Sequence, residues 1–171
     1  MRRDALLDAA EGLLAHSGSR ALTLAAVAQR AGVSKGGLLY HFATKEALVA
    51  GLVKRLITEL DEQIARYDDG TPAGYARAYV QATFDTLGEA PQSQRRWAAV
   101  VAAAAEAHML DPMRDALRRW HRRDETGADS VALRIVRLAA DGLWENVVLD
   151  PGLFNVADLD ALRVRLLEMA Q

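Results

Sequence analysis

Residues 23–48, TLAAVAQRAGVSKGGLLYHFATKEAL, predict two short helices that meet at a tight turn and a third helix that begins almost at once. Each of the three is preceded by a hydroxyl side chain that can cap its free amide groups: Thr23, Ser34 and Thr44. Gly32 ends the first helix, because glycine readily adopts the left-handed conformation of a helix stop. Two short helices joined at such a corner are typical of a helix-turn-helix.

The second of these helices has one apolar face and one face that is left for a partner. Leu38 and Phe42 are four residues apart, so both point toward a small core. In a helix-turn-helix this second helix lies in the major groove of DNA. Its outward positions are therefore predicted to face the groove, and they are Lys35, Gly36, Gly37, Leu39, Tyr40 and His41.

The run GVSKGGLLYHFATKEAL, residues 32–48, resembles the signature of the TetR family of transcriptional regulators. The resemblance covers about the first third of the chain at the level of the motif, and the remainder matches in length and helical pattern. It implies an all-helical homodimer that binds a double-stranded DNA operator and a small-molecule ligand. It also implies DNA contacts at the positions of Lys35, Gly36, Tyr40, His41 and Lys45.

The chemistry of the outward residues divides them between bases and phosphates. Lys35 can donate to guanine O6 and N7, while Gly36 and Gly37 let the backbone approach the groove. Leu39 offers only apolar contact, for example with a thymine methyl group. The residues expected at phosphates are Tyr40, His41 and Lys45, together with the helix starts at Thr23, Ser34 and Thr44.

Each of these residues also has an ordinary structural interpretation. A lone exposed lysine is usually a solvated charge, Tyr40 could be a packing aromatic, and His41 could cap a helix end. Found together at this spacing, however, they predict a DNA-binding surface.

The distribution of charge supports a DNA-binding end. Residues 1–55 contain eight Lys or Arg and four Asp or Glu, a formal charge of +4. The 13 basic and 19 acidic residues of 56–171 give −6, although the whole chain carries only −2. A basic end on an acidic body is what DNA binding through one end requires.

The composition limits the setting in which the protein works. None of the 171 residues is cysteine, which excludes disulfides and thiolate metal sites, and a reducing cytoplasm is the expected location. No run approaches the roughly 20 apolar residues of a membrane span. Neither a signal peptide nor a membrane anchor is expected.

Helical periodicity continues through the rest of the chain and predicts an all-α fold. A long helix is expected over Lys45–Tyr67, with a loop at 68–72 after it. Further helices are expected over Tyr75–Leu87, over Arg96–Met109, from Pro112, over Val131–Leu149 and over Val156–Ala170, with breaks at Gly127 and at Pro151 and Gly152. A first helix is expected over Asp4–His16, where apolar residues also recur at helical spacing. We therefore predict a three-helix head in residues 1–46, joined through the long helix to a ligand-binding and dimerisation bundle in residues 47–171.

The last two helices carry apolar stripes that are wider than one core requires. Such helices can pair with their symmetry mates into a four-helix bundle. The interface residues predicted on this basis are Ile135, Leu138, Gly142, Leu159, Leu162 and Leu166, with Gly142 allowing close approach. The alternative is that these stripes only fill the core of a single chain.

The helical body also has more large aromatic and polar side chains than a minimal core needs. A cavity lined by such groups is a normal small-molecule site. The candidates are Tyr79, Trp97, His108, Trp120, Asp141 and Trp144. The alternative places Trp97 and Trp144 in the core and His108 at a helix end. The four histidines have no metal-ligand spacing, and no metal or cofactor is predicted.

These observations predict a dimeric DNA-binding transcriptional repressor that a small molecule releases from its operator. A ligand-independent architectural DNA-binding protein is one alternative, and it would need no cavity. A helical-bundle enzyme or carrier is another, but the chain has no phosphate loop, metal spacing or recognisable nucleophile and base. Such an enzyme would also have no reason to keep a basic head.

Overall fold

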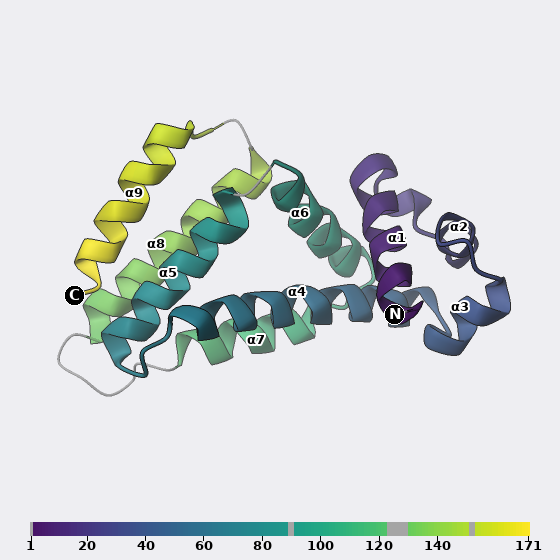
Figure 1. Ribbon diagram of the computed structural model, residues 1–171, viewed down its shortest axis with the longest axis horizontal. Helices are drawn as coiled ribbons and strands as arrows, with labels where there is room; N and C mark the ends of the chain where they lie inside the picture. The colour runs from purple at the N-terminus through teal and green to yellow at the C-terminus, as the bar shows by residue number, and fades with distance from the viewer. Residues whose placement is uncertain (1, 89–90, 123–129, 151–152) are drawn as a thin grey trace. The chain divides into compact units, whose positions relative to one another are not determined.

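The computed structural model describes residues 2–88, 91–122, 130–150 and 153–171, and the predicted breaks at Gly127 and at Pro151 and Gly152 lie outside these ranges. Within them every regular element is a helix and no strand occurs (Figure 1). The all-α prediction is therefore confirmed. The physical reason is the helical spacing of apolar residues along the chain, which lets successive helices bury one face each.

The chain packs as two compact units. Unit 1 contains Met1–Leu56 and Arg95–Met113, and unit 2 contains Ile57–Gln94 and Arg114–Gln171. The division predicted after residue 46 differs from this one, because the first part of the long helix packs in unit 1. A later segment also joins unit 1, and sequence periodicity gave no sign of this.

Unit 1 is built on the N-terminal helices α1 (Arg2–Ser17), α2 (Leu24–Arg30) and α3 (Lys35–His41), with a short 3-10 turn at Ser19–Ala21. The first part of α4 (Lys45–Tyr67) and most of α6 (Pro91–Glu106) complete it. Its core is aliphatic and fully buried, with Leu6, Leu7, Leu22, Val27, Leu38, Leu48 and Leu52 at its centre. This core fixes α2 and α3 and leaves the outer face of α3 uncovered.

A close approach in unit 1 explains a glycine in α4. A Cβ added at Gly51 would lie 2.8 Å from Cε1 of Phe42 and 3.3 Å from Cδ2 of Leu7. Phe42 is buried and immediately follows α3. Gly51 therefore lets the end of α3 pack directly on α4.

Unit 2 contains the end of α4 with α5 (Pro72–Gly88), most of α7 (Asp111–His121), α8 (Ser130–Leu149) and α9 (Val156–Met169). Helix α5 packs along α8 and also against α9 (Figure 1). The inner face of α8 follows the helical period, with Leu133, Val136, Ala140, Leu143 and Val147 buried.

Helix α6 begins earlier than the apolar pattern predicts, at Pro91 instead of Arg96. Proline suits the first turn of a helix because its missing N–H would have no partner there. The helix ends where His108 takes a left-handed conformation with φ 54°. Its N–H donates to the carbonyl of Ala105, and that of Met109 donates to the carbonyl of Ala104, the hydrogen bonds of a Schellman stop.

Candidate nucleic-acid interface and buried polar cluster

The three predicted helix caps are all present in unit 1. The hydroxyl of Thr23 accepts from the Ala26 amide, that of Ser34 from the Gly37 amide, and that of Thr44 from the Ala47 amide, each at 3.1 Å. These bonds satisfy amides that would otherwise lack a partner at the helix starts.

The turn between α2 and α3 also has the predicted geometry. Gly32 has φ 66°, in the left-handed region. Its N–H donates to the carbonyl of Gln29, and the N–H of Val33 donates to that of Ala28. This Schellman stop ends α2 and turns the chain toward the start of α3. A short motif of local hydrogen bonds thus sets the corner of the helix-turn-helix.

The outer face of α3 presents the residues predicted to contact DNA. Leu38 is fully buried, whereas Lys35, Gly36, Gly37, Leu39 and Tyr40 are exposed. Tyr40 is 87% exposed, so its phenol is held by little except an edge contact with the ring of His41 at 5.1 Å between centroids. A large aromatic residue left this open on a basic unit is suited to a partner surface.

Packing within the protein does not explain why α3 has glycine at both position 36 and position 37. A Cβ at Gly36 would have nothing within 4 Å, and one at Gly37 would meet only the Ser34 hydroxyl, at 3.3 Å. Each glycine lowers helix stability by roughly 1 kcal/mol relative to alanine. The bare backbone they create at the start of α3 is consistent with close approach to a groove.

His41 and Lys45 are less free than the sequence alone suggests. Both are half-buried in unit 1. The Lys45 ammonium donates to the carbonyl oxygen of Ser19 at 3.4 Å, which ties the start of α4 to the turn after α1. Lys45 thus has a structural contact in addition to its predicted role at a phosphate.

Three of the predicted ligand residues lie together in unit 2. The Tyr79 hydroxyl donates to Oδ1 of Asp141 at 2.5 Å, and the rings of Tyr79 and Trp120 are 6.3 Å apart. His121 joins them, with Nε2 2.7 Å from Oδ2 of Asp141 and its ring 5.8 Å from that of Tyr79. We call Tyr79, Trp120, His121 and Asp141, with the Arg137 side chain, the Asp141 cluster.

Burial fixes the protonation of the cluster's tyrosine. Tyr79 is 2% exposed, and burial, with the nearby Asp141 carboxylate, raises the pKa of its hydroxyl far above the ordinary value. Tyr79 therefore stays a hydrogen-bond donor at every physiological pH. Its donation leaves Asp141 as the acceptor that both Tyr79 and His121 share.

Arg137 is the fully buried basic residue of this cluster. It is 0% exposed, its Cζ lies 5.9 Å from the ring centroid of Tyr75, and its Nη2 donates to the His121 carbonyl at 3.4 Å. Burial lowers the pKa of the guanidinium from its usual value. A buried cation destabilises the folded state unless it has polar or aromatic partners, so the contacts with the His121 carbonyl and the Tyr75 ring are needed to hold Arg137 there.

Trp120 has a structural partner as well as its place in the cluster. Its indole N–H donates to Oδ1 of Asp61 at 2.6 Å, and Arg119 donates to the other oxygen of Asp61 at the same distance. These bonds hold α7 to the second half of α4 within unit 2. The indole N–H of Trp120 is thus used in the contact between these two helices.

The other predicted ligand residues lie elsewhere. Trp97 and His108 belong to unit 1, where Trp97 is buried and His108 terminates α6. Trp144 is half-buried on α8, one turn beyond Asp141. The structure thus brings Tyr79, Trp120 and Asp141 together and assigns Trp97 and His108 to a different compact unit.

Two members of the Asp141 cluster were not predicted from the sequence. Arg137 is on the buried face of α8 with Leu133 and Ala140, and helical spacing alone could have revealed that. His121 had no such signal, because its closeness to Asp141 depends on how α7 packs against α8.

The predicted interface residues on α8 and α9 differ in exposure. Ile135, Leu138 and Leu162 are 52%, 56% and 39% exposed, and Gly142 and Leu159 are half-buried. Leu166 is instead 8% exposed, because it packs inside unit 2. Leu166 is therefore part of the core of this chain and not of an open face.

The described residues contain neither a candidate membrane-spanning helix nor a candidate metal site. No described helix is both long and apolar enough to span a membrane. In the same part of the chain, no group of three His, Asp or Glu side chains is arranged to hold a metal ion.

Known protein families match both the N-terminal and the C-terminal part of the chain. Residues 6–52 match the model of bacterial regulatory proteins of the tetR family, and residues 73–171 match the C-terminal domain of tetracyclin repressor-like proteins. The transcriptional regulator BetI of Serratia proteamaculans is 29% identical over 175 residues, which cover 95% of this chain and 88% of BetI.

Two other proteins extend the comparison. The transcriptional repressor KstR2 of Rhodococcus jostii is 36% identical over 90 residues, covering 52% of this chain and 43% of KstR2. The structure of a SmeT–triclosan complex superposes with a TM-score of 0.71 at 22% identity, covering 99% of this chain and 89% of SmeT, which supports the fold. With a family model that matches more than half of its length, the chain belongs to the TetR family of DNA-binding transcriptional regulators and is not an enzyme.

Proposed function

We propose that this protein is a homodimeric repressor that binds an operator through two copies of α3 and leaves it when a small molecule binds in unit 2. The observation that carries the proposal is the open outer face of α3, where Lys35 and Tyr40 are exposed beside two glycines. Lys35 reads a base, and Tyr40, His41 and Lys45 hold phosphates. The relatives named as regulator and repressor support this role.

The homodimer is proposed from the open apolar face of unit 2. Val131, Ile135 and Leu138 lie at helical spacing on α8 and are all more than half exposed, and Leu162 and Met169 extend the apolar surface on α9. A monomer rarely leaves such a patch open. A two-fold dimer would cover it with the same patch of a second copy and would present two recognition helices to one operator.

The Asp141 cluster is the proposed centre of ligand binding. It combines buried aromatic rings with a carboxylate and an imidazole, the pairing of apolar walls and a few polar anchors that small-molecule sites use. Tyr79, Trp120 and Asp141 are the residues of this cluster expected to contact the ligand, and Trp144 lies one turn away on α8. The triclosan complex of SmeT is a precedent for a small molecule on this fold.

DNA selection from a random library, followed by sequencing of the bound fragments, would test the first part of the proposal. A repeated, two-fold symmetric site is the expected result. Enrichment of no sequence would leave an architectural DNA-binding role instead. Tyr40→Ala should lower the amount of DNA that the protein binds, whereas Arg118→Ala, which removes an exposed ion pair on α7, serves as the matched control.

Ligand release can then be tested with the selected DNA. A thermal-shift screen that begins with triclosan and includes other hydrophobic compounds would find stabilising ligands. A true effector should lower operator occupancy in wild type and have a weaker effect in Tyr79→Phe, which keeps the ring but loses the bond to Asp141. A compound that stabilises the protein and leaves operator binding unchanged would argue against a ligand-released repressor.

A further inference from the structure

Two polar bridges in unit 2 connect the end of α4 through α5 to α9. In the first, the Tyr67 hydroxyl donates to Oδ2 of Asp85 at 2.6 Å, while the Gln81 amide donates to Oδ1 at 2.8 Å. From α9, Arg163 donates through Nε to the Gln81 side-chain oxygen at 3.3 Å, and its Nη2 lies 3.7 Å from Oδ1 of Asp85. Tyr67 is the last residue of α4, so this bridge spans three helices.

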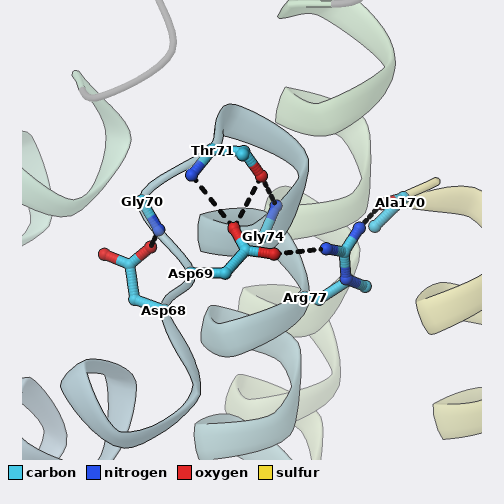
Figure 2. Close-up of polar contacts among 7 residues, drawn as sticks. All are labelled: Asp68, Asp69, Gly70, Thr71, Gly74, Arg77 and Ala170. Carbon is cyan, nitrogen blue, oxygen red and sulfur yellow. Dashed lines mark hydrogen bonds and ion pairs between the residues drawn. The ribbon is translucent and has the colours of Figure 1, made fainter.

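The second bridge starts in the loop after α4 (Figure 2). Asp69 accepts from the Thr71 amide at 3.0 Å and from the Thr71 hydroxyl at 2.6 Å. Arg77 on α5 donates a hydrogen bond from Nη2 to Oδ2 of Asp69 and another from Nη1 to the carbonyl of Ala170, each at 2.9 Å. One guanidinium therefore joins the end of α4 to the end of α9.

The apolar docking of α9 is narrow, so these polar contacts matter for its orientation. Among its described residues only Leu166, and Ala170 just beyond its end, are buried, whereas Leu162, Val164 and Met169 are exposed. Exposed ion pairs contribute little to overall stability. Two of them at separate points along one helix can still fix its angle, because each restricts a different part of it.

We propose that these two bridges, the α4–α9 clamp, fix the direction in which α4 leaves unit 2 relative to the subunit interface on α9. The clamp consists of Tyr67, Asp85 and Arg163 in one bridge, and Asp69 and Arg77 with the Ala170 carbonyl in the other. The inference rests on the proposed homodimer, because only a fixed interface gives this direction a consequence for the second subunit.

The length of α4 magnifies small changes at the clamp. Helix α4 continues from Tyr67 to Lys45, next to the recognition helix. Over its 23 residues, a turn of about 10° at one end displaces the other by about 6 Å at 1.5 Å rise per residue. Operator half-sites lie a fixed helical turn or a multiple apart, so such a displacement alters the match between dimer and DNA.

Distance measurements between the two heads would test the clamp. The chain has no cysteine, so Gln29→Cys on exposed α2 places one spin label on each head. Pulsed electron paramagnetic resonance on the DNA-free protein then reports the separation of the labels within a dimer. In the labelled parent we expect one narrow distance distribution. Absence of any dipolar signal would mean that no dimer forms, and that result would reject the proposed homodimer on which the clamp depends.

The informative variant combines Tyr67→Phe with Arg77→Ala and removes one contact from each bridge. Dimers of this variant, checked by sedimentation, should give a broader or shifted distribution and should lose the wild-type preference among operators with altered half-site spacing. Arg118→Ala, which removes an exposed ion pair on α7, is the control and should leave both readouts unchanged. If the double variant does not fold, Tyr67→Phe alone can be measured instead, because it removes only the hydroxyl that donates to Asp85. An unchanged distribution in a folded, dimeric variant would overturn the clamp.

Discussion

The carboxylate of Asp69 lies against Gly74 so closely that a Cβ at position 74 would overlap it (Figure 2). Gly74 is in the first turn of α5, and its own amide donates to the Thr71 hydroxyl at 2.9 Å. The absence of a side chain at this position gives the Asp69 carboxylate the room in which it meets Thr71 and Arg77. Glycine normally destabilises a helix, but here it is required for the conformation of the loop that precedes α5.

The effect of Gly74→Ala on the free energy of unfolding should therefore have opposite signs in wild type and in an Asp69→Ala variant. In wild type we expect it to destabilise the protein, because the carboxylate must leave its partners. In an Asp69→Ala background the same substitution should stabilise by about 1 kcal/mol, the gain in helix propensity. Urea unfolding of the four proteins in this cycle measures the difference. Equal effects in both backgrounds would show that Asp69 does not need the glycine.

The stability that Asp69 contributes should depend on pH in a defined direction. Hydrogen bonds from the Thr71 hydroxyl and amide, with Arg77 nearby, lower the pKa of Asp69 below its ordinary value. A lowered folded-state pKa means stability that is fully present above the unfolded value of about 3.9 and is lost as pH falls through the folded value. The difference in unfolding free energy between wild type and Asp69→Asn should thus be constant near neutral pH and shrink below about pH 4. A difference that grows on acidification would contradict this assignment.

Gly36→Ala should separate stability from DNA binding. A methyl group at position 36 has open space in the protein, so the change should raise stability by about 0.5–1 kcal/mol. The same methyl group would stand between α3 and the groove, and operator affinity should fall. Gly32→Ala is the matched control, since its φ of 66° makes alanine strained there and stability should drop. Chemical denaturation and operator titration give the two values. Undiminished affinity in Gly36→Ala would remove this glycine from the interface.

Lys35 and Tyr40 should affect operator binding differently. Lys35→Ala should flatten the preference at one base pair of each half-site, at a cost of about 1–3 kcal/mol for a bidentate contact. Tyr40→Phe should instead weaken binding to all operator variants equally, as expected of a phosphate contact. Lys45→Ala should also reduce the salt dependence of log K by roughly one, since one fewer phosphate is neutralised. Binding to a panel of single-base operator variants at several salt concentrations would distinguish these roles. Full selectivity in Lys35→Ala would mean that this lysine only positions the helix.

Gly142→Trp should disrupt dimerisation without unfolding the subunit. A Cβ at Gly142 has nothing within 4 Å in the single chain, so a large side chain can point outward there. In a dimer with α8 at the interface it would overpack the contact between subunits. Sedimentation should show monomer at micromolar concentration, with operator binding lost and helical content retained. A variant that remains dimeric would exclude Gly142, and the adjacent face of α8, from the interface.

The sequence by itself determined the features that depend on near neighbours in the chain. The caps at Thr23, Ser34 and Thr44 and the stop at Gly32 are local hydrogen bonds between residues at most five positions apart. The inward position of Leu38 follows from helical spacing, as does the outward position of Tyr40. Such features can be predicted because the backbone geometry of a helix relates each residue to its neighbours in a fixed way.

Only the tertiary structure decided which distant residues meet. His121 and Asp141 are twenty positions apart, and their side chains meet because α7 and α8 bring them together. The burial of Leu166 depends likewise on the docking of α9, and the grouping of Arg95–Met113 with the head depends on packing between distant segments. Helical periodicity states which face of a helix is apolar and leaves open which helix covers that face. That choice depends on how all the faces fit together, which no local pattern contains.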